Sequence, residues 1–449
     1  MSTTIEPAVD VEDEPKRLTV RGAVFLGIGA MVGAGIFALL GEAGAVAGAA
    51  VWISFLVAGA ISALLGYTVV KLGVRYPSSG GILAYLIEGF GNGRLVGVAS
   101  WMGYFAAILL VGAMIAVSFG DYASALFIGT NAAKGWSKLF ASLIVLAMAG
   151  VNIRGVRGVD KSQSLIVVAL LAVFAVFIVA TFTELQPHLL SPSEYPSARK
   201  IISSVALTFF AYLGFAVISF AAGDIPNPAR SLPQAMYIAL GVTTVLYVLI
   251  SVGVFGSLTV EQVIEYGPTA VAEAARPALG QAGFTIMSIA ALLATSSSVN
   301  ATLYASNGFT GALAKVGQFP PVFGSGSKLG QHGGLVITVV LTLVLVNFFN
   351  LSTIASVGSA VSLCVFVLVA CAGYRLRREI RAQPWPLVLA ILAAGFVLVF
   401  FAVDTLRNEP STFIAMAALI VLAFLLDLLW KWIRDRRTPT PHQGAPVGG

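Results

Sequence analysis

Charged side chains are scarce in this sequence. Asp, Glu, Lys and Arg together make up 10% of the 449 residues, whereas 58% are hydrophobic. Soluble domains carry about a quarter charged residues, which cover the surface that faces water. A water-soluble globular protein is therefore excluded, and the composition predicts an all-α chain that lies in a lipid bilayer.

Cysteine and histidine are also rare. The two cysteines, Cys364 and Cys371, lie on one predicted helix, separated by a rise of about 10 Å that is too long for a disulfide. His188, His332 and His442 fall in predicted loops or the C-terminal tail, without the spacing of metal ligands. The sequence thus predicts no metal site, no cofactor and no nucleophile–histidine catalysis, and we do not expect an enzyme.

Long apolar runs recur from Arg21 onward, each near or above the roughly 20 residues that cross a bilayer as a helix. The first twenty residues are polar and acidic, so no cleavable signal peptide is expected. With both termini in the cytoplasm, the inside segments hold 20 of the 26 basic residues, which face anionic lipid and need no nucleic-acid partner. The twelve predicted spans are centred near residues 35, 60, 110, 144, 172, 211, 245, 297, 342, 363, 394 and 421.

The spans suggest two units of five, at residues 21–185 and 198–375, followed by two further helices at 384–434. Tails at 1–20 and 435–449 flank them. An odd number of spans per unit turns the second unit upside down relative to the first, as in inverted-repeat transporters. The turn-rich loop at 76–93 is expected to hold a short interfacial segment.

The first predicted span carries four glycines in Gly27-Ile28-Gly29-Ala30-Met31-Val32-Gly33-Ala34-Gly35. One interpretation is close helix packing, because Gly29 and Gly33 form a GxxxG pattern. The other is an unwound segment. Unwinding at Gly33-Ala34-Gly35 would leave amides at the start of a half-helix for a substrate carboxylate, and carbonyls around Met31 and Val32 for an ammonium group.

Four stretches together resemble the amino acid, polyamine and organocation (APC) superfamily of transporters. The glycine cluster is the first, and the other three follow along the chain in the order that the superfamily has them. This resemblance implies a LeuT-type fold of twelve transmembrane helices, with a five-plus-five inverted repeat, two extra helices, and the first and sixth helices unwound at the midplane. It also implies carriage of amino acids or related amines by alternating access. The other three stretches are Tyr76-Pro77-Ser78-Ser79-Gly80-Gly81, Gly155-Val156-Arg157-Gly158, and the segment from Phe209-Phe210-Ala211-Tyr212-Leu213-Gly214-Phe215 to Asn227-Pro228-Ala229-Arg230-Ser231-Leu232-Pro233.

The resemblance also implies where substrate binds. The substrate carboxylate would meet the amides of Ala34 and Gly35, and the ammonium group the carbonyls of Met31 and Leu213. Phe210 would cap the substrate from the sixth helix, although ordinary packing is the alternative for this ring. The full set of expected substrate-binding residues is Met31, Gly33, Ala34, Gly35, Phe210, Ala211 and Leu213.

The sequence departs from the superfamily pattern at two positions. Ala216 stands where many members carry an acid, and Leu170 aligns with a lysine of several proton-coupled relatives. No ionisable residue lies near the middle of the predicted core helices, and Glu42, Asp121, Asp224 and Asp427 are expected to be solvated or capped residues near helix ends or in the peripheral last helix. A neutral amino acid is therefore the predicted substrate, with a polyamine, amine or cationic amino acid as the alternative.

The eighth span holds the hydroxyl run Thr295, Ser296, Ser297 and Ser298. Such oxygens could hold a coupling sodium ion, or they could bond back to their own helix. Coupling to H⁺ or Na⁺ therefore stays open, as does a monomer or homodimer. The predicted location is the plasma membrane, as a multi-pass protein of a bacterial inner membrane. A channel is disfavoured, because Tyr104, Ser118 and Tyr122 do not make a charged or continuous polar pore.

Overall fold

The computed structural model describes residues 19–78, 81–130, 132–154, 159–220, 222, 225–324 and 332–437. Within these ranges the regular elements are all helices, which confirms the all-α class. The predicted motif at Gly155–Gly158, Asp224 and most of both predicted tails lie outside the described residues.

Many of the helices are long enough to span a bilayer. Short 3₁₀ segments and one π-helical segment, η2, join some of them end to end. In the first half of the chain the elements are α1 (Val20–Ala34), α2 (Ile36–Ala47), η1 (Gly48–Ala50), α3 (Val51–Arg75), α4 (Ile82–Phe90), α5 (Arg94–Tyr104), η2 (Phe105–Leu110), α6 (Val111–Phe127), α7 (Lys134–Ile153), α8 (Val159–Thr183), η3 (Pro187–Leu190) and η4 (Pro192–Glu194). In the second half they are α9 (Ala198–Phe210), η5 (Leu213–Ala216), α10 (Val217–Phe220), α11 (Pro228–Ser257), α12 (Val260–Tyr266), η7 (Gly267–Thr269), α13 (Ala270–Glu273), α14 (Arg276–Lys315), η8 (Pro321–Phe323), α15 (Gly333–Phe348), α16 (Leu351–Arg375), α17 (Pro384–Asn408) and α18 (Pro410–Arg437).

Ten helical stretches of the described chain are long and apolar enough to cross a membrane. One of them, Ile36–Arg75, joins α2, η1 and α3, and two shorter apolar helices lie at Val20–Gly33 and Gly333–Phe348. These lengths and compositions support a multi-pass membrane protein.

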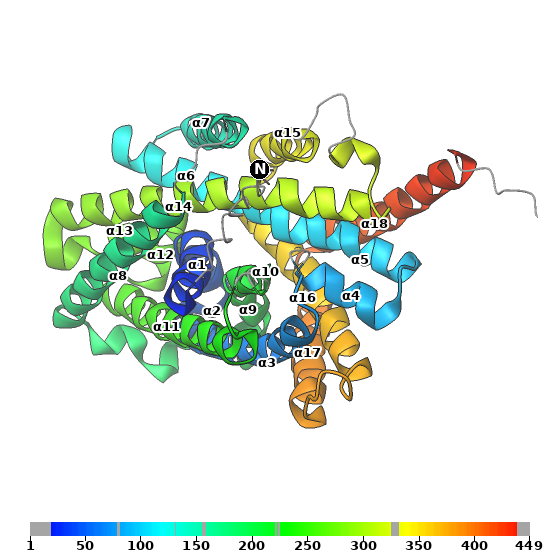
Figure 1. Cartoon of the computed structure of the whole chain (residues 1–449). Coiled ribbons are helices and arrows are strands. Elements are labelled where there is room, and N and C mark those ends of the chain that lie inside the picture. Colours follow the sequence, from blue (N-terminus) through cyan, green and yellow to red (C-terminus); the bar gives the residue numbers. More distant parts are fainter. Residues whose placement is uncertain are drawn as a thin grey trace, which may run out of the picture.

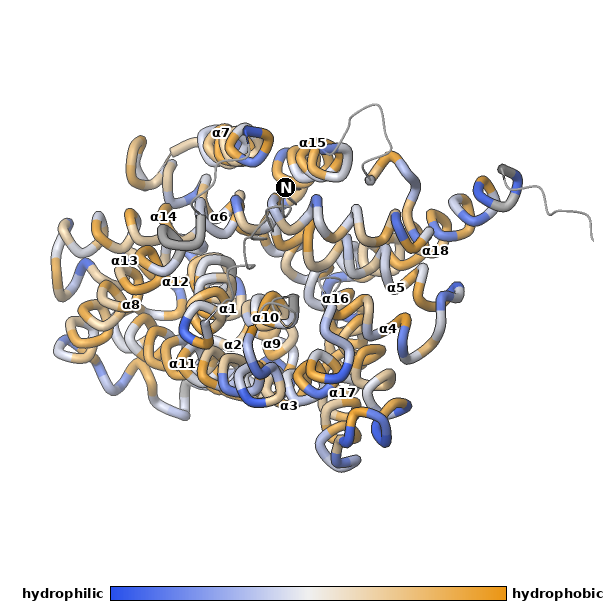
Figure 2. Tube along the Cα trace, viewed as in Figure 1, coloured by the Kyte–Doolittle hydropathy of each residue, from blue (hydrophilic) through white to orange (hydrophobic). Residues whose placement is uncertain are grey.

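Helices α1 and α2 occupy the centre of the bundle (Figure 1). α1 packs against α8, α11 and α14, and it meets η5 and α10 from the second half of the chain. The apolar side chains on the outer helices stay exposed, for example Leu165 on α8, at 71%, and Leu392 on α17, at 63%. Figure 2 shows apolar segments on the peripheral helices. Side chains of this kind are stable in hydrocarbon and unfavourable in water.

The loop after α3 contains α4, a nine-residue helix. Its N-cap, Gly81, has φ 53°, a left-handed conformation that glycine adopts without strain. The sequence predicted a short segment in this loop, and the structure places a helix there that packs against α5 and α16.

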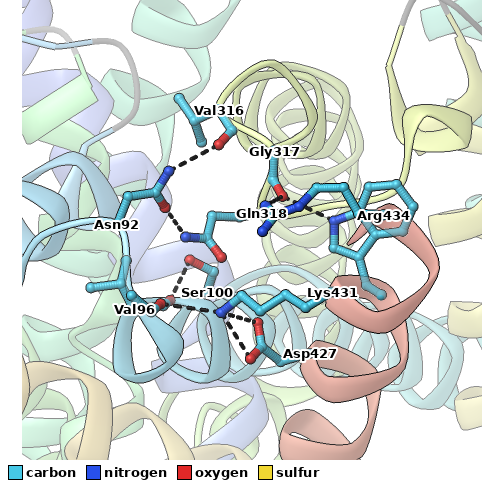
Figure 3. A network of polar contacts seen from close by, with 11 residues as sticks. Asn92, Val96, Ser100, Val316, Gly317, Gln318, Asp427, Lys431 and Arg434 are labelled. Atoms are coloured by element: carbon cyan, nitrogen blue, oxygen red, sulfur yellow. Dashed lines mark hydrogen bonds and ion pairs between the residues drawn. The ribbon is translucent and has the colours of Figure 1, made fainter. Parts of the chain in front are cut away.

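The last helix, α18, is attached to the bundle by a polar cluster near its C-terminal end (Figure 3). Asp427 is 1% exposed, and the ammonium nitrogen of Lys431 lies 2.9 Å from its Oδ1 and 3.0 Å from its Oδ2. Lys431 also donates to the carbonyl of Gly93, at 3.3 Å, just before α5. The expectation that Asp427 is a solvated or capped residue was wrong. Asp427 is buried, and Lys431, one helical turn further on, forms an ion pair with it.

The same cluster connects α18 to the chain that follows α14. Trp430 Nε1 and Arg434 donate to the carbonyl of Gly317, at 2.9 and 3.2 Å. Gln318, which is 1% exposed, donates to Asn92. The end of α18 therefore holds the start of α5 and the end of α14 together.

Candidate substrate-binding site

The first central helix is interrupted at Gly35. α1 ends at Ala34 and α2 begins at Ile36, with Gly35 between them at φ −93° and ψ −76°. The amide of Gly35 still donates to the carbonyl of Met31, at 2.8 Å, and the amide of Leu39 donates to the carbonyl of Gly35, at 2.9 Å. The interruption is thus confined to one residue, and the first amides of α2 point toward the end of α1.

A second interruption follows Phe210 at the end of α9. The chain turns through Ala211 and Tyr212, whose amides donate to the carbonyls of Thr208 and Phe209, at 3.1 and 2.9 Å. It then continues as the 3₁₀ helix η5, which contains Leu213. A bond from residue i to i−3 replaces the α-helical pattern here, so the axis of the helix shifts at this point.

The two interruptions lie against each other through backbone contacts. A Cβ atom on Gly214 would lie 2.5 Å from the carbonyl carbon of Ala30, and one on Gly35 would lie 2.7 Å from the carbonyl oxygen of Ala211. Real Cβ atoms essentially never come this close to backbone, so glycine is required at both positions. This contact brings Met31, Gly35, Ala211 and the η5 segment with Leu213 together.

Tyr247 of α11 joins the two interruptions. Its hydroxyl lies 2.7 Å from the carbonyl oxygen of Met31 and 3.2 Å from that of Ala211. Since a phenol has one proton, the two carbonyls share it. Tyr247 was missed by sequence reasoning, because one tyrosine in an apolar span has no periodic signal. A polar ring in the seventh predicted span was the available clue.

The remaining predicted residues surround this junction. Phe210 is 1% exposed, and its ring lies directly against Gly358 of α16, where a Cβ would come within 2.9 Å of a ring carbon. Gly33 faces α14, because a Cβ there would lie 2.7 Å from the carbonyl oxygen of Ala294. The side chain of Ala34 lies outside the described residues.

The hydroxyl run of α14 divides between its own helix and α1. Thr295 and Ser296 donate to the carbonyls of Ala291 and Leu293, at 2.6 and 3.1 Å. Ser298 instead reaches the carbonyl of Gly29 on α1, at 3.5 Å, and Ser297 has an interaction of its own. The structure therefore brings Ser298 to the first helix and leaves Thr295 and Ser296 in the back-bonded arrangement.

Formal charge is absent from the chain around the junction. No Asp, Glu, Lys or Arg occurs between Arg21 and Glu42, between Lys200 and Asp224, or between Arg230 and Glu261. The polar groups at the junction are backbone amides, backbone carbonyls and one phenol. Such groups can hold a small dipolar molecule, but they cannot neutralise an additional charged side chain.

We expect Tyr247→Phe to lower transport turnover at least tenfold, because the two interruptions lose the hydroxyl that connects them. The free energy of unfolding should fall by about 1–3 kcal/mol, the cost of a buried acceptor left without its donor. Tyr104→Phe is the matched control: its buried hydroxyl lies 2.9 Å from Thr338 Oγ1, away from the junction. The control should lose stability and keep turnover. Equal turnover in the two variants would contradict the role of Tyr247.

Interrupted helices that meet inside a bundle of long apolar helices are typical of membrane transporters. The chain belongs to the amino acid permease family, whose model matches residues 18–426, and so to the APC superfamily. It is a transporter and not an enzyme.

Individual proteins are similar over nearly the whole chain. The inner membrane transport protein YbaT of Escherichia coli is 32% identical over 416 residues, which cover 93% of this chain and 96% of the relative. The serine/threonine exchanger SteT of Bacillus subtilis is 26% identical and covers 90% of this chain and 96% of its own. A manganese transporter of Eremococcus coleocola has a TM-score of 0.60 over 96% of this chain and 98% of its own, at 13% identity, which is a likeness of fold alone.

Proposed function

We propose that this protein carries neutral amino acids across the plasma membrane as a secondary active transporter that works by alternating access. The observation that carries the proposal is the junction at which α1, α2, α9 and η5 present uncharged polar backbone groups to one another. In the proposed topology α1 with α2 forms the first span and α15 the ninth, giving twelve spans in a five-plus-five inverted repeat, residues 21–185 and 198–375, with α17 and α18 appended. Both termini lie in the cytoplasm.

The proposed site holds the two charged ends of an amino acid with opposite ends of helices. The amide end of α2 attracts the carboxylate, because free N–H groups and the helix dipole favour negative charge there. The carbonyls of Met31 and Leu213 accept from the ammonium group, and Phe210 covers the side chain. In the structure the Tyr247 hydroxyl donates to the Met31 carbonyl, so an ammonium group that binds this carbonyl would replace a hydrogen bond within the protein.

A neutral side chain suits this site better than a cationic one. An additional ammonium or guanidinium group in the centre of the bundle would need a carboxylate, and the chain around the junction supplies none. The similarity to a serine/threonine exchanger is in line with a small neutral substrate. Polyamines, amines and cationic amino acids are the alternative, and exchange is the alternative mode to uptake with a coupling ion.

Sodium is the proposed coupling ion if the α14 hydroxyls act as ligands, and a proton is the alternative. Ser298 supports sodium, because its hydroxyl oxygen and the carbonyl oxygens of Gly29 and Ala294 meet at the contact between α1 and α14, where they could act as ligands of a cation. Hard cations bind oxygen ligands of this kind. Thr295 and Ser296 are weaker candidates, since their protons are directed to their own helix.

The test is thermal stabilisation of the detergent-purified protein by the twenty amino acids and common polyamines, with sodium or with choline as the cation. A neutral amino acid at a hundred times its Kd should stabilise the protein by about 2.7 kcal/mol. Ser298→Ala should remove any sodium requirement, whereas Ser296→Ala, the matched control, should leave it unchanged. Stabilisation by polyamines or cationic amino acids alone would overturn the proposed substrate class. Stabilisation that does not depend on sodium would assign coupling, if any, to protons.

A further inference from the structure

A basic groove lies at one end of the bundle, away from the substrate junction. It has a volume of about 560 Å³ and is formed by the end of α3, the beginning of α11 and the loop between α16 and α17. Among its lining residues are Lys71, Arg75 and Arg381, with Glu379, and Ala229 and Pro233 from α11. Pro233 has no N–H, so it cannot donate the usual α-helical hydrogen bond to the carbonyl of Ala229 in this wall of the groove.

Two of the three cations of the groove, Lys71 and Arg75, are positioned by neighbouring groups that carry no charge. Lys71 donates to the carbonyl of Arg381, at 3.3 Å, and its nitrogen lies 5.7 Å from the centre of the Tyr67 ring. Arg75 lies 5.6 Å from the centre of the Tyr76 ring. The ion pairs in the described part of the chain involve other cations, namely Arg199, Arg276 and Lys431. Positive charge therefore remains available to a ligand.

The single acid of the groove is already engaged. Tyr76 donates its phenolic proton to Glu379, at 2.8 Å, and this bond raises the pKa of Tyr76 above its ordinary value. The phenol thus stays protonated at neutral pH and continues to donate to the carboxylate. With three cations and one acid, the groove keeps an excess of positive charge and suits an anion.

Aromatic residues place the groove at the level of lipid headgroups. Trp385 is 63% exposed at the start of α17, and Tyr237, one turn beyond Pro233 on α11, is 41% exposed. Tyr67 accepts from the amide of Gln383 beside them. Exposed Trp and Tyr residues gather where the hydrocarbon of a membrane meets its headgroups.

The helices beside the groove also expose apolar side chains along their length. α3 packs between α11 and α17. Away from the basic end, α3 exposes Leu56, at 47%, α11 exposes Val245, at 58%, and α17 exposes Leu392, at 63%. A ligand with a charged head at the groove could lay an acyl chain against exposed side chains of this kind, where burial of each CH₂ contributes about 0.8 kcal/mol.

We propose that the groove formed by Lys71, Arg75 and Arg381 binds the phosphate headgroup of an anionic phospholipid. A soluble anion would use the cations but not the adjoining aromatic and apolar surface. Basic pockets between membrane helices are suited to anionic headgroups, and each Lys or Arg near such a surface contributes about a fivefold factor in affinity. The inference concerns a surface separate from the substrate junction and does not depend on the proposed substrate.

The test compares two triple variants by native mass spectrometry in detergent with added phosphatidylglycerol. The groove variant is Lys71→Gln, Arg75→Gln and Arg381→Asn; asparagine tolerates the left-handed backbone at this position, where φ is 49°. The matched control removes three exposed cations elsewhere, with Arg94→Gln, Arg154→Gln and Lys315→Gln. We expect the groove variant to lose at least tenfold in apparent affinity for phosphatidylglycerol, and the control to lose less than twofold. Equal losses in the two variants would overturn the proposal, because general surface charge would then explain binding.

Two further arms separate the possible sources of the anion. Phosphatidylcholine should bind the wild type and the groove variant equally, because its headgroup is neutral overall. Inorganic phosphate should not compete with phosphatidylglycerol at equal concentration, and full competition would assign the groove to a soluble anion instead of a lipid. Native mass spectra also show whether each variant is folded and loaded with lipid, without any measurement of transport.

Discussion

Gly35→Leu is expected to abolish substrate-induced stabilisation and to reduce transport to background. A Cβ at this position would lie 2.7 Å from the carbonyl oxygen of Ala211 and 2.8 Å from that of Met31, and closer still to the Tyr247 hydroxyl. The leucine side chain must therefore displace the backbone that is proposed to bind the substrate. Overpacking of this kind also lowers stability by about 1–3 kcal/mol. Thermal melting with and without a neutral amino acid measures both effects.

Two other glycine variants make this result interpretable. Gly241→Leu is the matched control, because Gly241 on α11 is exposed and a Cβ there would meet nothing within 4 Å. It should keep substrate-induced stabilisation and transport. Gly35→Ala adds a single methyl group and should weaken binding even if the leucine variant does not fold. Normal binding by a folded Gly35→Ala protein would rule out the junction as the substrate site.

Lys431→Met is expected to destabilise the protein by about 3–5 kcal/mol, the cost of leaving a buried carboxylate without its cation. Asp427 is 1% exposed, and Lys431 is its ion-pair partner, so the variant leaves a buried charge while keeping most of the lysine stem. The measurement is the free energy of unfolding, obtained by titrating a denaturing detergent into the protein in a mild detergent. The loss should also weaken the attachment of α18 to the start of α5.

Removing the acid together with the lysine should restore stability. In Asp427→Leu/Lys431→Met no charge is buried, and the free energy of unfolding should return near the wild-type value. Lys315→Met, at an exposed position at the end of α14, should change stability by less than about 0.5 kcal/mol. A double variant as unstable as Lys431→Met alone would show that the cluster acts through its shape and not through its charge pair.

Composition predicted an all-α membrane chain, and the glycine cluster marked the part of the first span where the structure has its one-residue interruption at Gly35. The scarcity of charge excludes a soluble chain whatever the details of packing, and clustered glycines mark backbone that approaches other backbone. Both interpretations of the glycine cluster have a counterpart in the structure: Gly33 packs closely on α14, and Gly35 separates two helices. The unwound segment and its ligand stay predictions.

Contacts between distant spans could not be predicted in the same way. Tyr247 lies 216 residues from Met31 in the sequence, and no local sequence pattern predicts that the two residues are in contact. The hydroxyl run illustrates the same limit, since Thr295, Ser296 and Ser298 have equal sequence signals. Thr295 and Ser296 nevertheless donate to their own helix, and Ser298 reaches α1. For Asp427 the clue was present, because a lysine four residues later forms an ion pair on the same face of a helix. Its burial nevertheless depends on where α18 packs.

The contact of Gly214 with Ala30 and Met31 has a mechanical consequence for the bundle. At this point the contact joins backbone to backbone, so no side chain separates the two segments there. The crossing point is therefore suited to act as a pivot, with α1 as the lever arm on one side. From Met31 to Val20 this arm is about 16 Å long, so a rotation of roughly 10° moves its outer end by about 3 Å, the width of a water molecule.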